Sequence, residues 1–141
     1  MRVLFITDVK IYKIEGNYYI NNGVKASVKR FSQKFGNVTL LGLDRTDACP
    51  PNNIALVEKV KISFYKSNFD FIFNYLKINR DWLKSFDLWI IRTPTWLGFN
   101  IYKLCKKYNI PYLCEVISDP FSTLWYHSFK GKLAAIFLKS I

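Results

Sequence analysis

The hydrophobic residues of this chain fall into short continuous runs separated by stretches with a helical period. Continuous apolar runs are typical of strands that are buried on both faces, and they occur at Arg2–Thr7, Val38–Leu43, Leu88–Ile91 and Tyr112–Ile117. Ile54–Phe64 also has an extended pattern, with apolar and polar residues alternating towards its end. The pattern therefore predicts four buried strands and one further extended segment.

Between these runs the apolar residues recur every three or four positions, which predicts helices. Three such stripes are Val24, Val28, Phe31 and Phe35; Phe69, Ile72, Phe73 and Leu76; and Leu97, Ile101, Leu104, Cys105 and Tyr108. Ser67-Asn68 and Thr93-Pro94-Thr95 precede the second and third stripes and are expected to cap those helices. A last helix is expected from about Lys130, and Asp8–Asn22 is predicted to be a long loop.

Alternation of strands and helices with continuous apolar strands predicts an α/β fold, with a parallel sheet covered on both faces. Because crossovers in such sheets are right-handed, we expect a Rossmann-like, doubly wound domain that occupies residues 1–141. Ligands of this fold lie beyond the carboxyl ends of the strands. The loops expected to carry function are therefore Asp8–Gly23, Arg92–Trp96 and Ser118–His127.

The chain stops inside an apolar helical run, Leu133–Leu138, without a capping glycine or a polar tail. We therefore expect the N-terminal half of a larger α/β enzyme, with its second domain missing.

Composition excludes several classes of protein. Half of the residues are hydrophobic and 18% are aromatic, which is far from a disordered composition. No apolar run approaches the roughly 20 residues of a membrane-spanning helix, and the first apolar run is too short for a secretory signal, so a cytoplasmic location is expected. Three cysteines without C-x-x-C spacing and a single histidine, His127, argue against a zinc site. A G-x-G-x-x-G fingerprint and a phosphate-binding P-loop are both missing, which disfavours nicotinamide, flavin and P-loop nucleotide enzymes.

The net charge of +11 is spread over several predicted helix faces. Nucleic acid, an anionic membrane surface and a phosphate-bearing substrate would each suit such a field. Plain solvated helix faces explain it equally well, so charge alone does not choose among them.

Candidate functional residues stand at the expected ligand edge of the sheet. Asn22-Gly23 begins the first helix, where a glycine lets an anion approach free backbone N–H groups, although a plain turn before a helix explains it as well. Arg92 ends the third strand and is suited either to clamp a phosphate or carboxylate or to pair with an acidic neighbour. Trp96 is suited to stacking on a sugar or base, or to packing.

Two carboxylates belong to the fourth strand. Glu115 lies within the strand, where a buried carboxylate needs a partner, so a structural ion pair is expected for it. Asp119 follows the strand and is the better functional candidate. Ser118, Asp119 and His127 do not make a hydrolase triad, because the chain lacks a G-x-S-x-G elbow.

These residues resemble those of a known family. The opening strand, the Asn22-Gly23 helix start, Val38–Gly42, and Asp87–Arg92 with Pro94 are similar to the N-terminal half of GT-B glycosyltransferases, closest to the retaining family 4 of the bacterial polysaccharide kind. Pro111–Pro120, followed by Trp125, His127 and Lys130-Gly131-Lys132, carries most of the resemblance.

The resemblance implies transfer of a sugar from a nucleotide donor to a glycan or lipid-linked acceptor, with retention of configuration and without a metal or other cofactor. The chain would then be the acceptor-side domain, inactive alone. Gly23 would approach the donor phosphates, and Asp119 would face the reacting sugar or acceptor. The chain has Asn22 where many members have a second glycine, and His127 comes later than their cleft histidine.

The basic surface and the aromatic residues would also suit docking on the inner face of a membrane. One alternative is a basic α/β module that binds nucleic acid or another anionic partner without catalysis, which is disfavoured because the lysines are scattered over several helices. Another is a stand-alone flavodoxin-like or regulatory domain, which lacks the phosphate-binding loop of flavin proteins.

Overall fold

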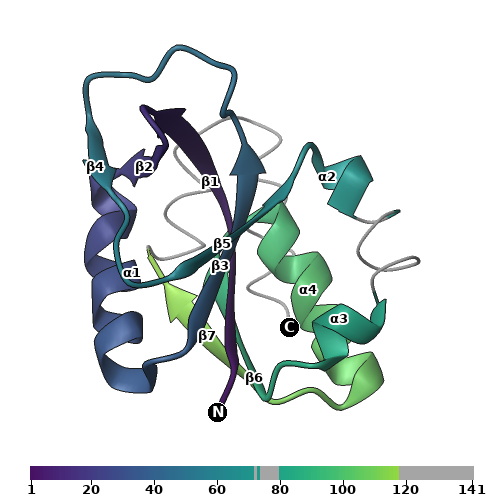
Figure 1. Cartoon of the computed structure of the whole chain (residues 1–141). Coiled ribbons are helices and arrows are strands. Elements are labelled where there is room, and N and C mark those ends of the chain that lie inside the picture. Colours follow the sequence, from purple (N-terminus) through teal and green to yellow (C-terminus); the bar gives the residue numbers. More distant parts are fainter. Residues whose placement is uncertain (72, 74–79, 118–141) are drawn as a thin grey trace.

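The computed structural model describes residues 1–71, 73 and 80–117, and it has a mixed α/β fold with a seven-stranded sheet (Figure 1). Five strands are parallel, in the spatial order β5-β3-β1-β6-β7. They are β1 (Val3–Ile14), β3 (Val38–Asp44), β5 (Lys61–Tyr65), β6 (Leu88–Thr93) and β7 (Tyr112–Val116). Two short strands, β2 (Asn17–Asn21) and β4 (Ile54–Leu56), continue the sheet from the far end of β1 in antiparallel pairing.

Helices cover the two faces of the parallel strands (Figure 1). On one face α1 (Asn22–Phe35) packs Val24 and Val28 against a core formed by Val3, Phe5, Val38, Leu40 and Ile90. On the other face α4 (Trp96–Tyr108) and α3 (Arg80–Lys84) pack against Leu4, Ile6, Leu41, Trp89 and Ile91. Successive residues of β1 and β6 thus point alternately into the cores on the two faces of the sheet, which explains why the buried part of each strand is continuously apolar.

The predicted helix caps are confirmed. The Thr95 hydroxyl accepts a hydrogen bond from the Gly98 N–H at 2.8 Å at the start of α4. The Ser67 hydroxyl accepts from the Asp70 N–H at 3.1 Å at the start of the single turn α2 (Asn68–Asp70). Both satisfy backbone N–H groups that a helix start otherwise leaves without a partner. At the other end of α4, Asn109 takes the left-handed conformation that ends many helices.

The predicted loop at Asp8–Asn22 is wrong: the chain forms a β-hairpin there. β1 runs on to Ile14 and pairs with β2 through a two-residue turn, Glu15-Gly16, in which both residues have positive φ. Hairpin turns of this length need that backbone twist. Buried Val9 and Ile11 alternate with exposed Asp8 and Lys10, which is a strand pattern. The hairpin makes the sheet mixed, whereas a parallel one was expected.

The extended segment Ile54–Phe64 divides into two strands with different partners. Ile54–Leu56 forms β4 and pairs with β2, whereas β5 pairs in parallel with β3. Between them Lys59 has a φ of 60°, so the backbone turns where a continuous extended segment was predicted.

The predicted stripe after Ser67 is also wrong in part. Phe71 is the buried aromatic residue, packed against Tyr65, whereas Phe69 and Phe73 are exposed. Ile72 and Leu76 lie outside the described residues, as does the helix expected from Lys130.

The prediction that the fourth parallel strand is buried is wrong as well. β7 has no neighbour on its outer side among the described residues, and Leu113, Val116 and Ile117 are exposed. Cys114, which belongs to this run predicted to be buried, is exposed too, whereas Cys105, which belongs to the predicted apolar stripe of α4, is buried. Among the described residues, no helix is long and apolar enough to cross a membrane.

Candidate functional site

A crevice of about 490 Å³ lies at the carboxyl end of β6, next to the middle of β1 and the start of α1. Its polar lining includes Asp8, Lys10, Asn21 and Arg92, and the remaining lining residues are Val9, Tyr12, Gly23, Val24, Pro51, Ile54 and Ile117. This is the edge of a parallel sheet at which ligands of α/β proteins usually bind. The crevice therefore unites two of the predicted segments, the one that begins at Asp8 and the one that begins at Arg92.

Arg92 lies at the crevice, but it is also half of an ion pair. Its Nε lies 3.5 Å from Oε2 of Glu115, which is its register partner on β7. The side chains of Arg92 and Glu115 are only 13% and 9% exposed. Neither of the two facing atoms makes a hydrogen bond within the described residues. Pairing with an acidic neighbour, one of the two roles considered for Arg92, is therefore observed.

Glu115 connects three elements, and its expected role in an ion pair is confirmed. Its Oε1 accepts hydrogen bonds from the Ser27 hydroxyl and from an Arg30 nitrogen, the latter at 2.7 Å. Both donors belong to α1, whereas Arg92 belongs to β6. This bridge therefore fixes the position of Arg92 relative to the start of α1, on the other wall of the crevice.

The start of α1 is capped from within the chain. The Asn21 side chain accepts a hydrogen bond from the Gly23 N–H at 2.8 Å, so the Gly23 N–H proposed for an anion already has a partner. The Asn22 side chain donates to Oδ1 of Asn53 at 2.6 Å and ties α1 to the loop before β4. Gly23 lines the crevice, whereas Asn22 does not.

Asp8 is the carboxylate that lines the crevice, and the sequence analysis did not single it out. It follows Thr7, at which β1 leaves its register with β3. The Thr7 carbonyl accepts a hydrogen bond from the Tyr65 hydroxyl at 2.9 Å, and the Thr7 hydroxyl accepts from the Val9 N–H at 3.3 Å. These contacts lie at the register shift of β1 in which Asp8 stands. Its place directly after the predicted strand Arg2–Thr7, at the edge of the sheet where ligands are expected, was the available signal.

Other predicted residues lie elsewhere. Trp96 is the first residue of α4, is 59% exposed and does not line the crevice. Asp119 and His127 lie outside the described residues, as does the whole predicted segment Ser118–His127. Of the predicted site residues, Gly23 and Arg92 therefore line the same crevice, and Asp8 lines it with them.

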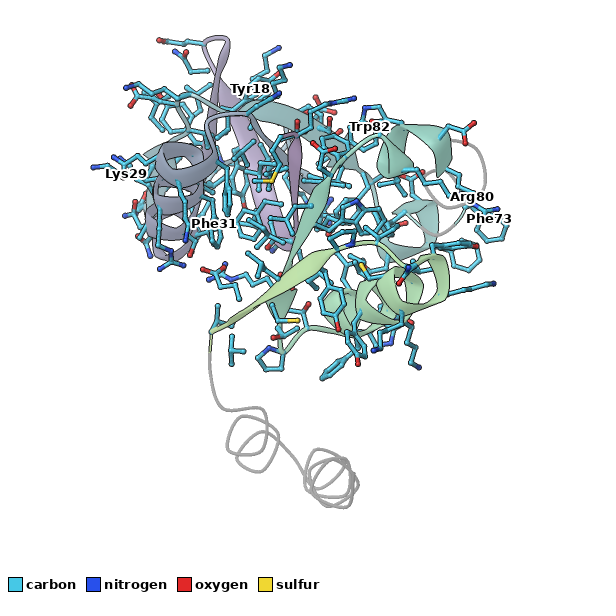
Figure 2. All side chains as sticks on the ribbon, turned by 90° about the horizontal axis from the view of Figure 1, so that it is seen from below. Tyr18, Lys29, Phe31, Phe73, Arg80 and Trp82 are labelled. Atoms are coloured by element: carbon cyan, nitrogen blue, oxygen red, sulfur yellow. The ribbon has the colours of Figure 1, made fainter. Side chains whose placement is uncertain are left out.

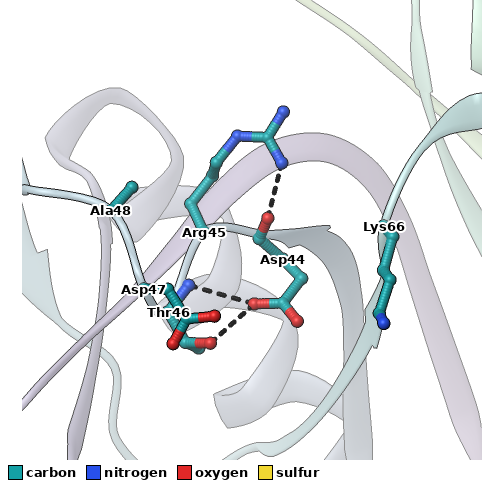
Figure 3. A pocket seen from close by; sticks show the side chains of 6 residues that line it. All are labelled: Asp44, Arg45, Thr46, Asp47, Ala48 and Lys66. Atoms are coloured by element: carbon teal, nitrogen blue, oxygen red, sulfur yellow. Dashed lines mark hydrogen bonds between the residues drawn. The ribbon is translucent and has the colours of Figure 1, made fainter.

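A second polar hollow, of about 440 Å³, lies at the carboxyl ends of β3 and β5 (Figure 3). The carboxylate of Asp44 is held in place there, because its Oδ1 accepts hydrogen bonds from the Thr46 N–H at 3.0 Å and the Thr46 hydroxyl at 2.8 Å. These bonds, the backbone one foremost, lower the pKa of Asp44 despite some burial, with smaller contributions from Lys66 and Arg45. Asp44 is therefore ionised at neutral pH.

Chemically, the crevice offers a guanidinium, a carboxylate and an apolar wall. A guanidinium binds phosphate or carboxylate groups, and a carboxylate accepts hydrogen bonds from sugar hydroxyls. Within the described part of the chain, no group of three or more His, Cys, Asp or Glu side chains is arranged to hold a metal ion. The crevice thus suits a polar organic ligand.

Comparison with known protein families finds no match, and no solved structure matches the chain. Among curated proteins the chain is similar to Protein CapJ of Staphylococcus aureus, with 31% identity over 144 aligned residues. The alignment includes 96% of this chain but only 37% of CapJ. The chain therefore spans little more than a third of the length of this relative, and it resembles CapJ over nearly all of its own length.

Proposed function

We propose that the chain is the acceptor-side domain of a glycosyltransferase of polysaccharide biosynthesis, in the GT-B fold and nearest to the retaining family 4. The observation that carries the proposal is the crevice between the carboxyl end of β6, the middle of β1 and the start of α1, with Asp8 and Arg92 on its walls. The hydroxyls of a sugar donate hydrogen bonds to a carboxylate, and its ring carbons pack on an apolar wall. The lining of the crevice offers both.

Two further observations support the proposal. The strand order β5-β3-β1-β6-β7, with helices on both faces, is the order expected of a doubly wound, Rossmann-like half. The name of the relative CapJ points to capsule formation, which is a polysaccharide-producing process. Because CapJ is much longer than this chain, a second domain would supply the nucleotide-sugar site, and the chain alone would be inactive.

A binding experiment tests the role of the crevice. UDP-glucose, UDP-N-acetylglucosamine and short glucans would be titrated into the 15N-labelled chain, with amide shifts as the readout. We expect at least one glycan to shift Asp8, Lys10 and Ile117, and Asp8→Asn to weaken its binding at least fivefold. Shifts that avoid these residues with every ligand would contradict the proposal.

A second experiment tests the activity. The complete product of the encoding gene would be incubated with UDP-, GDP- and dTDP-sugars and a glycan acceptor, with nucleotide release as the readout. We expect release that depends on the acceptor and is absent for the 141-residue chain alone. Release by the chain alone would contradict its assignment as the acceptor-side half.

A further inference from the structure

The edge strand β7 exposes apolar side chains on both faces of the sheet. Its register with β6 pairs Cys114 with Ile91, which belongs to the core under α4, so Cys114 and Val116 lie on the α4 face. Glu115 contacts α1, so its neighbour but one, Leu113, lies on the opposite face. In Figure 2, β7 lies at the margin of the sheet, with α1 on one side of it and α4 on the other.

On the α4 face, the exposed side chains of β7 join exposed aromatic residues of α4. The Tyr102 ring packs edge-on against Tyr112 at the start of β7, with 5.4 Å between the ring centres, and Phe99 stands three residues earlier on the same side of the helix. Phe99, Tyr102 and Val116 are 39%, 38% and 63% exposed. We call Phe99, Tyr102, Cys114 and Val116 the α4–β7 surface. Apolar side chains gathered in this way are typical of a surface that another segment covers.

The chain itself contains a segment suited to this surface. In the last helix that the sequence predicts, the apolar residues Leu133, Phe137 and Ile141 recur at every fourth position. Lys132 and Lys139 fall on the opposite side of that helix. Residues 118–129 can span about 40 Å. This is more than twice the length of the five-residue strand β7, so the predicted helix can reach any part of the surface.

The handedness of the fold assigns this helix to the α4 face. Crossovers between parallel strands are right-handed, so the direction of a crossover decides which face its helix covers. From β1 the chain crosses to β3 through α1 on one face, and from β6 it crosses in the other direction to β7 through α4 on the opposite face. A helix that continues outwards from β7 therefore covers the face of α4, which is the side of Val116 and not that of Leu113.

We propose that residues 130–141 pack as a helix on the α4–β7 surface through the row formed by Leu133, Phe137 and Ile141. A second copy of the chain is a poorer occupant, because each copy carries a net charge of +11 and the copies repel each other. The segment is instead tethered beside the surface, which gives it a high effective concentration there. The proposal rests on the exposed side chains and the topology, and it is independent of the function proposed for the crevice.

The first experiment compares two variants of the full chain that each replace an exposed aliphatic side chain of β7. Val116→Gln changes the α4–β7 surface, whereas Leu113→Gln is the matched control on the opposite face. Limited trypsin cleavage after Lys132 and Lys139 is followed by mass spectrometry. We expect Val116→Gln to speed this cleavage at least about fivefold and Leu113→Gln to speed it less than about twofold, because proteolysis tracks the population of the open form.

Cleavage after Lys29, within α1, is the internal control for folding. Its rate should stay unchanged in both variants, since a variant that merely unfolds would be cut faster there as well. Phe99→Gln repeats the test from the helix side of the surface, and we expect it to speed the cleavage after Lys139 as Val116→Gln does.

The second experiment measures proximity directly. A nitroxide is attached to Ser140→Cys in a chain that also carries Cys49→Ser and Cys114→Ser, and the amide signals of the 15N-labelled protein are compared with those of the reduced label. We expect the label to broaden the amide signals of Phe99 and Val116 and to leave that of Lys29 sharp.

Several results would overturn the proposal. Cleavage after Lys139 as fast in the wild-type chain as in a synthetic peptide of residues 118–141 would exclude packing, and so would equal effects of Val116→Gln and Leu113→Gln. Broadening on α1 in place of α4 would put the segment on the other face. Protection that appears only at concentrations where sedimentation shows a dimer would assign the surface to a second copy.

Discussion

Arg92 and Glu115 face each other across the neighbouring strands β6 and β7, with 3.5 Å between the Arg92 Nε and the Glu115 Oε2. Arg30 on α1 reaches the other carboxylate oxygen of Glu115 at 2.7 Å. The two arginines differ in environment, because the side chain of Arg30 is 63% exposed and that of Arg92 is 13% exposed. The carboxylate of Glu115 thus pairs with a solvent-exposed arginine and a mostly buried one at the same time.

This difference predicts unequal effects of substitution. Glu115→Gln leaves the guanidinium of Arg92 buried without a counter-charge, so we expect the free energy of unfolding to fall by about 3 kcal/mol. Arg30→Gln removes a solvent-screened partner and should lower it by less than about 1 kcal/mol. Urea unfolding followed by tryptophan fluorescence measures both, since Trp89 is buried in the core. Equal losses would show that the pair with Arg92 contributes nothing.

The strands of the core and the helix caps could be predicted from sequence because their signals are local. Continuous apolar runs indicated β1, β3, β6 and β7, and Thr95 stands directly before an apolar stripe. The expected ion pair of Glu115 followed from the cost of burying a carboxylate without a partner. Its partners could not be predicted, because Arg30 is 85 residues away in the sequence.

The features that escaped prediction depend on tertiary context. Glu15-Gly16 lacks the Asn-Gly or Asp-Gly signal of a tight hairpin turn, so the chain between Asp8 and Asn22 reads as a loop. The apolar residues of β7 indicate a buried strand whether or not a neighbour covers it, and sequence does not reveal where the edge of the sheet lies. Asp8 escaped for the same reason, since its place in the crevice depends on how β1, β6 and α1 come together.

Gly98 is predicted to tolerate no side chain. A Cβ at this position would lie 2.3 Å from the backbone oxygen of Arg92, where α4 begins against the end of β6. Gly98→Ala should therefore lower the free energy of unfolding by about 1–3 kcal/mol, although alanine favours helices. Gly23→Ala is the matched control at the start of α1, because its Cβ would meet only the Asn21 side chain, at 3.2 Å. Chemical denaturation of both variants checks the contrast, and a Gly98→Ala variant as stable as Gly23→Ala would refute the close packing.

The three cysteines are predicted to react at different rates. Burial raises the pKa of Cys105 to about 12, and it also raises that of Cys114, which remains exposed. At pH 8 only about one Cys105 in ten thousand would be a thiolate, the reactive form. We therefore expect Ellman's reagent to modify Cys49 first, Cys114 more slowly and Cys105 only as the fold opens. Cys49→Ser should remove the fastest phase, and rapid labelling of Cys105 in the folded chain would contradict its burial.

Asp44 is predicted to make stability depend on pH in the acid range. Its pKa is lowered from the usual 3.8, so the folded chain releases this proton more readily than the unfolded chain does. The resulting stabilisation is fully present above pH 3.8 and is lost as the pH falls through the lowered pKa. Melting temperatures of wild type and Asp44→Asn between pH 2 and pH 7 should therefore differ at neutral pH and converge in acid.

Thr46→Ala keeps the backbone N–H, the larger cause of the shift, so it should retain most of this pH dependence. Parallel curves for wild type and Asp44→Asn would show that the Asp44–Thr46 hydrogen bonds do not favour the ionised carboxylate.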